Sequence, residues 1–337
     1  MYIVKIYLSS DQSAPLGISQ ISFNSKKEKC CIAAFCMKNA RMEVAVFGAS
    51  GFIGSHTCER LRADGMAVRE LARRSEPPLD ALKATEAEMA DAISGCDAVV
   101  NVIGIKCPDG AQTFHAMHVT VLEKILAVMR EAGVRRLVNI SVVVSKPDPG
   151  SAYHDTKWQA DELLRASGVD WTLLKPGVVY GRGDNMLGHL TQMIGLTRFF
   201  PIVDRGRSQM QPVCVLDVAA AISACVQQPE TNGHTFAVVG PTPLELRKIV
   251  RTVAEAMGRP VVILPTPYHL MKPAVHAMGW VMREPLSTPA QLQMLREGMT
   301  GNVEPMRREL GVDPRAFTAE NIRGLLPERW RNNSKPK

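Results

Sequence analysis

Three glycines at a regular spacing are the first residues of this chain whose pattern points to chemistry. Gly48, Gly51 and Gly54 follow the apolar run 44–47, and a helical pattern continues from them to Leu61. A strand that ends in a glycine turn and opens a helix directs backbone N–H groups and the positive helix end at a pyrophosphate. Glycine is needed because a Cβ would block the turn, the approach of the phosphates or the packing of helix on strand. The stretch predicts dinucleotide binding; a βα turn without a ligand is the alternative.

Two further residues that could take part in chemistry lie about one hundred residues further along the chain. Tyr153 and Lys157 are spaced i, i+4, which places both side chains on one face of the expected helix 151–166. Tyrosine is among the side chains that can donate or accept a proton in catalysis. Because a Tyr-x-x-x-Lys sequence arises often by chance, its meaning depends on the strand that precedes it, which we count as the fifth.

The composition narrows the class of protein. With 46% hydrophobic and 22% charged residues the chain is typical of a globular protein, and no run approaches the roughly 18 apolar residues of a membrane span. Much of the net charge of +7 lies in residues 1–41, which contain six basic and two acidic residues. This distribution argues against nucleic-acid binding, which needs a basic stripe on the folded domain. The eight scattered cysteines show no disulfide framework, which indicates a reducing, cytoplasmic compartment.

Residues 1–41 are expected to be a disordered extension outside the fold. They are rich in Ser and Lys, and their apolar run 30–37 is too short for a secretory core followed by a cleavage region. An organelle-targeting peptide and an upstream start codon, with Met42 as the natural beginning, remain alternatives. The cysteines of this segment lack partners at metal-binding spacing, so we expect no metal site.

From Met42 onward, strand and helix patterns alternate, which predicts a parallel sheet with right-handed crossovers. The expected strands are 43–47, 67–72, 97–103, 136–141, 171–175, 211–215 and 234–239. The expected helices are one that follows the glycine turn and ends at about 63, then 86–93, 113–131, 151–166, 186–200 and 244–257, with a further helix that Asp217 caps and that runs to Val226. The fold class is therefore α/β, a doubly wound parallel Rossmann sheet with a smaller C-terminal substrate lobe.

This pattern also divides the chain into domains. We expect an NAD(P)-binding Rossmann domain at 42–183 and a C-terminal lobe at 184–330, with 211–239 returning to the Rossmann domain and 331–337 as a tail.

With these motifs in place, residues 42–327 resemble the extended and atypical short-chain dehydrogenase/reductases. The likeness rests on the segments 46–54, 97–104, 151–157, 175–181, 211–219 and 239–241. Within the superfamily the chain is most similar to the NAD(P)-binding family of the 39-kDa-type accessory subunit of respiratory complex I and its bacterial relatives. The resemblance implies coenzyme contacts from Gly48, Ser50, Gly51, Phe52, Ile53, Gly54, Asn101, Gly104, Lys157 and Pro176. Leu82 then follows the third strand, where the family often has an adenine-binding Asp, and Asn101 ends the fourth.

The choice of coenzyme depends on the end of the second strand. Relatives that prefer NAD have an acid there for the ribose 2′-hydroxyl. In this chain Ala72 occupies that place and Arg73 follows it, which offers a guanidinium to a 2′-phosphate. This favours NADP(H), with NAD as the alternative if Arg73 is only a solvated loop charge.

The resemblance also assigns catalytic roles. It implies that Lys157 binds the nicotinamide ribose and lowers the pKa of Tyr153, so that the phenol exchanges a proton while hydride moves to or from the nicotinamide. Ser141, twelve residues before the tyrosine, is the expected assistant, with Ser145 as a second candidate. His118 stands where many relatives have an Asn, and is either a proton relay or a packed histidine.

The C-terminal part gives two interpretations of function. Its Met-rich segments 269–282 and 289–299 are either core or an apolar substrate site, and Trp280 with Arg283 is consistent with a face for a membrane or a partner. One class is an NADP(H)-dependent oxidoreductase or epimerase acting on a small molecule. The other is a non-catalytic NADPH-binding accessory or assembly factor of a membrane-associated complex, peripheral to the membrane.

Overall fold

The computed structural model describes residues 41–105, 107–147, 151–271, 273, 295 and 297–331. The interpretations given for the N-terminal extension, for Trp280 and Arg283 and for most of the Met-rich segments lie outside these described residues. Residues 42 onward form one compact unit. Among the described residues no helix is long and apolar enough to cross a membrane.

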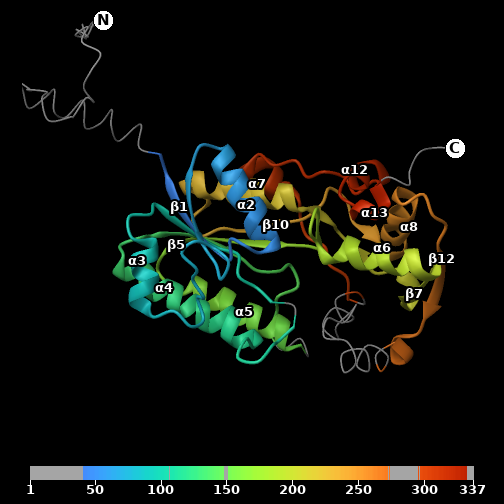
Figure 1. The fold of residues 1–337 in the computed structure, drawn as a ribbon, viewed down its shortest axis with the longest axis horizontal. Helices are drawn as coiled ribbons and strands as arrows, with labels where there is room; N and C mark the ends of the chain where they lie inside the picture. The colour runs from blue at the N-terminus through green and yellow to red at the C-terminus, as the bar shows by residue number, and fades with distance from the viewer. Residues whose placement is uncertain are drawn as a thin grey trace, which may run out of the picture. The chain divides into compact units, whose positions relative to one another are not determined.

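A six-stranded parallel sheet forms the centre of this unit, as the alternating pattern predicted (Figure 1). Its strands, in spatial order, are β10 (Thr235–Val238), β5 (Asp170–Pro176), β4 (Arg136–Ile140), β3 (Ala98–Asn101), β1 (Glu43–Phe47) and β2 (Ala67–Leu71). The strand order reverses beside β1, and ligands of such sheets bind outside the carboxyl ends of the strands at this point.

Helices cover both faces of the sheet, which explains why the central strands are apolar along their whole length. The helices α2 (Phe52–Ala63) and α7 (Val215–Gln227) pack on one face, against Val44, Val46 and Val100. On the other face lie α3 (Glu86–Ile93), α4 (Val121–Glu131) and α5 (Ala152–Arg165), which pack around Phe47 and Val99. A π-helical turn, η2 (Ala116–Thr120), leads into α4.

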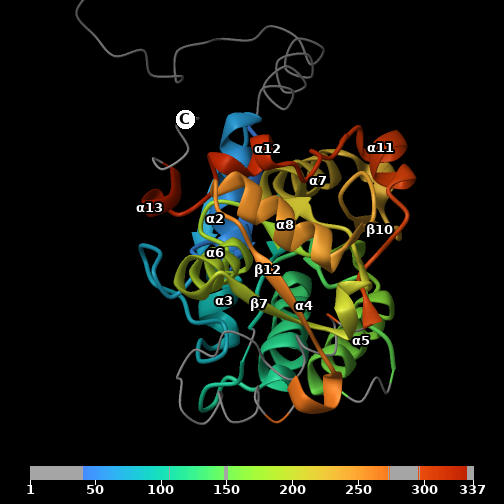
Figure 2. The same cartoon turned by 90° about the vertical axis from the view of Figure 1, so that its right-hand side faces the viewer.

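Most of the segments after Gly183, together with β6 (Val179–Tyr180), build a separate apolar cluster, and Figure 2 shows the arrangement of their helices. Its helices are α6 (Asn185–Thr197), α8 (Leu246–Ala256), α12 (Ala319–Arg323) and α13 (Glu328–Arg331), and α11 (Glu304–Leu310) packs near β10. Its short strands pair two by two: β6 with β9 (Val213–Cys214), β8 (Gln209–Met210) with β11 (Leu244–Glu245), and β7 (Phe199–Val203) with β12 (Val262–Thr266). The 3₁₀ turns η3 (Asp204–Gly206) and η4 (Pro229–Thr231) complete the described elements.

The strand count before Asn101 was wrong. Between β2 and β3 the described chain forms turns and α3, and no strand. Asn101 therefore ends the third strand, not the fourth, and Leu82 lies in a turn. By the same count the helix of Tyr153 follows the fourth strand, β4, and not the fifth.

Three further local expectations were also wrong. Asp217 lies inside the first turn of α7, whose N-cap is Cys214, and its carboxylate accepts a bond of 2.8 Å from the backbone N–H of Arg315. The helix α6 stops at Thr197 because Arg198 takes a left-handed φ of 58°, and Phe199 begins a strand instead. The expected strand 211–215 is reduced to β9, after the Gln211-Pro212 step, where proline has no N–H for a ladder.

Candidate active site

The glycine turn after β1 is tight enough to require its glycines. Gly48 has a φ of +85°, and its N–H donates to the Leu71 carbonyl at the end of β2, 2.9 Å away. A Cβ at Gly54 would lie 2.1 Å from the Gly48 carbonyl oxygen, and one at Gly51 would lie 3.1 Å from it. The start of α2 therefore rests directly on the turn, which only glycine permits.

The N-terminal end of α2 is accessible and carries no competing negative charge. Ser50 and Gly51 are exposed, Phe52 and Ile53 are half-buried, and no acidic side chain lies in the first turn of α2. The helix N-cap is Gly51, which has no side chain that could occupy the free N–H groups. These residues fit the pyrophosphate of a dinucleotide.

Arg73 lies just beyond the end of β2, next to this turn. Its side chain is exposed, and no ion pair joins it to another described residue. The nearby acid, Glu70, is paired with Arg62 at 2.6 Å and does not reach the strand tip. Ala72 is buried, and its carbonyl accepts from the Ser75 hydroxyl at 2.7 Å. The strand tip thus presents a guanidinium and no carboxylate.

Asn101 and Gly104 connect the glycine turn to the candidate pair Tyr153 and Lys157. The Asn101 side chain donates to Asn139 at 2.8 Å and accepts from the Ile103 N–H at 3.2 Å, so it fixes the chain after β3. A Cβ at Gly104 would lie 3.8 Å from Nζ of Lys157. The structure therefore brings these residues to the same end of the sheet.

Tyr153 and Lys157 project from α5 at this end. The Lys157 ammonium donates to the Ile140 carbonyl at 3.2 Å, and burial lowers its pKa to about 8 while Asp161 opposes the shift. Burial raises the pKa of Tyr153 to about 12, the reverse of the lowering that the resemblance implied. The phenol is therefore a proton donor at neutral pH in this structure.

The two candidate serines differ in their environment. Ser141 is 5% exposed, and its Oγ has no hydrogen-bond partner among the described residues. Ser145 Oγ donates to Asp161 and accepts from Lys175, both at 2.7 Å. Ser141 is thus the serine whose hydroxyl is available to a ligand. Pro176, at the end of β5, accepts from the Val143 N–H at 3.1 Å and fixes the loop that follows Ser141.

A group of aromatic and imidazole rings surrounds Tyr153. Its ring makes edge contacts with Phe114, His118 and His154, at centroid distances of 5.4–5.5 Å. His118 is 4% exposed and lies in the π-helical turn η2, a distortion that is frequent at functional sites. Burial, with a contribution from the Lys157 charge, lowers the pKa of His118 to about 2, so the imidazole is neutral. Its Nε2 has no partner among the described residues.

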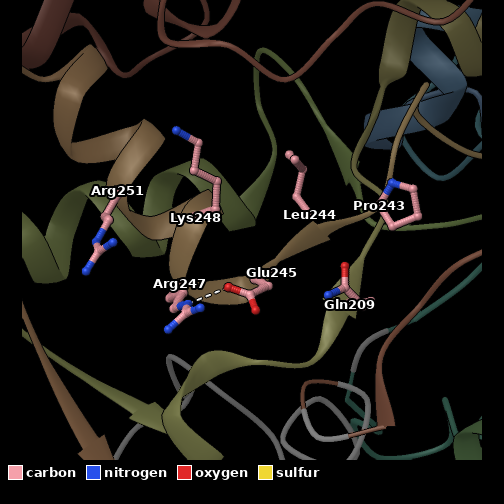
Figure 3. A pocket seen from close by; sticks show the side chains of 7 residues that line it. All are labelled: Gln209, Pro243, Leu244, Glu245, Arg247, Lys248 and Arg251. Carbon is pink, nitrogen blue, oxygen red and sulfur yellow. Dashed lines mark hydrogen bonds and ion pairs between the residues drawn. The ribbon is translucent and has the colours of Figure 1, made fainter.

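Two cavities could receive a substrate. A cavity of about 350 Å³ is lined by Val143, Val144, Ser145, Lys146, Glu297 and Gly298, and so lies on the loop that follows Ser141. A larger one of about 570 Å³ lies on the N-terminal end of α8, beneath Arg247, Lys248 and Arg251 (Figure 3). The smaller cavity is the better candidate for substrate because it adjoins the loop that follows Ser141.

Three residues of the site were missed from the sequence. Thr156 holds His118, and the buried Asp161 forms an ion pair of 2.8 Å with the partly buried Lys175. Asp161 follows Lys157 by four residues on α5, and this spacing was the signal available in the sequence. Lys175 gave none, because its partner comes from a different element.

Comparison with known proteins agrees with the fold and with the class of coenzyme. Residues 48–229 match the profile of a family described as NAD(P)H-binding. The chain belongs to this family. Its central sheet and glycine turn are the Rossmann-type, short-chain-dehydrogenase-like architecture that the motifs predicted, and NAD(P)H is the coenzyme class of the family.

Individual relatives of this NAD(P)H-binding protein are distant. It is 25% identical to a farnesyl-dihydroquinoline-oxide ketoreductase of Stigmatella aurantiaca, over 84% of this chain and 96% of that protein. It is 24% identical to subunit 9 of the NADH dehydrogenase [ubiquinone] 1 alpha subcomplex of Rattus norvegicus, over 84% and 80%. Among solved structures, an NADPH-dependent quinone oxidoreductase of Escherichia coli complexed with NADPH matches with a TM-score of 0.65 at 16% identity, covering 84% and 99% of the two chains.

Proposed function

We propose that this NAD(P)H-binding protein is an NADP(H)-dependent oxidoreductase that reduces a carbonyl group of a small molecule, or oxidises the corresponding alcohol. The observation that carries the proposal is that Lys157, four residues after Tyr153 on α5, donates to the carbonyl of Ile140, the residue before Ser141, whose buried hydroxyl has no partner among the described residues. A buried hydroxyl without a hydrogen bond is costly, by about 1–3 kcal/mol, unless a ligand completes it. The similarity to a ketoreductase supports this class of reaction.

The residues divide the work of the reaction between them. NADPH, when bound, supplies a hydride to the carbonyl carbon. Tyr153 donates its phenolic proton to the carbonyl oxygen, and Ser141 donates a hydrogen bond to the same oxygen. Lys157 places a positive charge near the phenol and stabilises the phenolate that remains. In the reverse reaction, alcohol oxidation, the phenolate of Tyr153 accepts the proton of the substrate hydroxyl, and the hydride moves from the substrate carbon to the oxidised coenzyme.

Arg73 at one end of the site indicates the coenzyme, and the cavity at the other end indicates the kind of substrate. Arg73 provides a charge-assisted partner for a 2′-phosphate, which favours NADPH over NADH. The cavity of about 350 Å³ is lined by Val143 and Val144 beside Ser145 and Lys146, which suits a substrate with an apolar part and one polar end.

A matched pair of tyrosine variants tests the proposed function. Tyr153→Phe removes the proton and keeps the ring, so hydride transfer from NADPH to a panel of quinones, enones and ketones should fall by roughly 10²–10⁴. Tyr180→Phe is the control, because Tyr180 is a buried tyrosine of the C-terminal cluster whose hydroxyl has no partner among the described residues. It should keep full activity. Equal activity of wild type and Tyr153→Phe would contradict the mechanism.

A second candidate function, a non-catalytic NADPH-binding accessory protein peripheral to a membrane, is supported by one surface. Leu196, Phe199, Val262 and Leu264 are 75%, 52%, 49% and 44% exposed. Phe199 and Val262 are paired directly across β7 and β12, so these side chains form part of one apolar patch. Such patches mark membrane or protein interfaces, and a relative of this chain is a subunit of a mitochondrial NADH dehydrogenase.

Flotation with phospholipid vesicles tests this second function. Wild type should float with the vesicles, and Phe199→Glu together with Val262→Glu should remain at the bottom of the gradient. If wild type and the double variant behave alike, the patch is not a membrane contact.

A further inference from the structure

A hydrogen-bonded network of three side chains, centred on Asp161, lies one helix turn beyond the proposed catalytic lysine. Asp161 on α5 is fully buried, and its Oδ2 accepts from Lys175 Nζ at 2.8 Å and from Ser145 Oγ at 2.7 Å. Lys175 also donates to Ser145 Oγ at 2.7 Å, so the triangle is closed. It joins α5, β5 and the loop after β4.

One acceptor of this network is unused. Asp161 Oδ1 is buried and has no hydrogen-bond partner among the described residues, while Oδ2 has two donors. Lys157, four residues earlier on the same helix face, has Ile140 O as its recorded acceptor. Residues four apart on a helix have Cβ atoms about 5–6 Å from each other. The second oxygen of Asp161 is therefore the nearest negative charge that the helix offers to the Lys157 ammonium.

Four charged or titratable side chains surround Lys157. Asp161 and the neutral phenol of Tyr153 lie on α5, the cation Lys175 lies on β5, and the neutral imidazole of His118 lies in η2. The backbone carbonyl of Ile140 comes from β4. Asp161 is thus the one carboxylate in this set: it pairs directly with the partly buried Lys175, and its charge also favours the protonated form of Lys157.

We propose that Asp161 and Lys175 are positioning residues that set the charge of the catalytic Lys157. The carboxylate of Asp161 stabilises the protonated form of Lys157 in its buried site, and the Lys175 ammonium weakens this stabilisation. This proposal rests on the proposed function, because the charge of Lys157 matters for the reaction only if it stabilises the phenolate of Tyr153. Burial alone favours the neutral amine, and the pKa of Lys157, at about 8, stands close to neutral pH. A small change in this network therefore changes the fraction of charged Lys157.

The proposal predicts shifts of opposite sign from two variants. Asp161→Asn removes the only negative charge in this set and should lower the pKa of Lys157 by about one pH unit or more. Lys175→Met removes the competing cation and should raise it. In Asp161→Asn with Lys175→Met the two charges leave together, so the pKa should return close to the wild-type value. A purely structural role would not give opposite signs.

The test is an NMR titration of the full chain labelled with ¹³C at the lysine Cε atoms, without coenzyme. The Lys157 resonance is identified by its loss in Lys157→Met, and the protein is titrated from pH 6 to pH 11. Glu162→Gln is the matched control, because Glu162 neighbours Asp161 but is exposed and pairs with Arg165. It should leave the midpoint near 8. Circular dichroism of each variant confirms the native fold, and the doubly substituted protein, which leaves no unpaired buried charge, serves if a single variant does not fold.

The outcomes separate this inference from the proposed function. Opposite shifts that cancel in the double variant support the network. An unchanged Lys157 midpoint in Asp161→Asn, or shifts of the same sign in the two single variants, would overturn it, even if Tyr153→Phe abolishes hydride transfer. Conversely, the titration is independent of any substrate, so it stands if the protein proves to be an accessory factor.

Discussion

Oγ1 of Thr156 lies 3.0 Å from Nδ1 of His118 and 2.7 Å from the carbonyl oxygen of Ala152. Two oxygens this close need a proton between them, and only the threonine hydroxyl has one to give. Thr156 therefore accepts from His118, which fixes the proton of the neutral imidazole on Nδ1 and leaves Nε2 as a bare acceptor. Of the two interpretations of His118, this geometry supports a packed, hydrogen-bonded and uncharged ring beside Tyr153.

Protonation of His118 should destabilise the fold. Its pKa is about 2 in the folded protein and near 6.5 when unfolded, so the unfolded state binds the extra proton and stability falls as pH drops below 6.5. Between pH 7.5 and 5.5 wild type should lose about 1.4 kcal/mol more than His118→Asn. Urea denaturation at both pH values measures this. His115→Asn, at an exposed position three residues earlier, should follow wild type. Parallel curves for wild type and His118→Asn would refute the assignment.

The glycine turn gives a steric prediction. Gly54→Ala places a Cβ where the Gly48 carbonyl oxygen lies, so the turn must open, with a loss of about 1–3 kcal/mol or more and of NADPH binding. Gly188→Ala is the control, because its Cβ would meet no atom within 4 Å inside α6. That variant should be stabilised by up to about 1 kcal/mol. Chemical denaturation and coenzyme fluorescence titration read both effects, and normal NADPH affinity in Gly54→Ala would be incompatible with the turn as described.

The contact between Asp217 of α7 and Arg315 of the C-terminal segment should contribute to the free energy of folding. Asp217 is 4% exposed, and Arg315 supplies it with both a backbone N–H and a guanidinium. Arg315→Met leaves the buried carboxylate with only the backbone donor and should reduce stability by about 1–3 kcal/mol. The exposed pair of Arg135 and Asp170 is the reference, and Arg135→Met should change stability by at most about 1 kcal/mol. Similar losses in the two variants would show that burial of Asp217 is unimportant.

Local signals in the sequence predicted much of the fold. The glycine spacing located the turn of Gly54, and the apolar periodicity located α3 at residues 86–93, because both depend on neighbours within one or two turns of chain. The strand count before Asn101 failed because it was carried over from the resemblance, whereas turns fill that segment here. The cap assigned to Asp217 failed because a distant residue, Arg315, binds its carboxylate.

The polar interior of the site was less predictable. The spacing named Tyr153 and Lys157 as candidates and Ser141 before Ser145, but it could not show which of the two serines keeps a hydroxyl without a partner. That choice depends on Asp161 and Lys175, which come from different elements and meet Ser145 only after folding. For the same reason the direction of the Tyr153 pKa shift could not be read from the helix alone.

The central claim is that this chain binds NADP(H) with the 2′-phosphate at Arg73, and calorimetric titration of NADPH and NADH tests it most directly. A charge-assisted bond contributes about 1.5–3 kcal/mol, so wild type should bind NADPH roughly 10- to 150-fold more tightly. Salt should reduce the preference, Arg73→Ala should remove most of it, and Arg74→Ala, at the neighbouring exposed arginine, should keep it. Equal affinities for the two coenzymes in wild type, or a preference for NADH, would contradict the account.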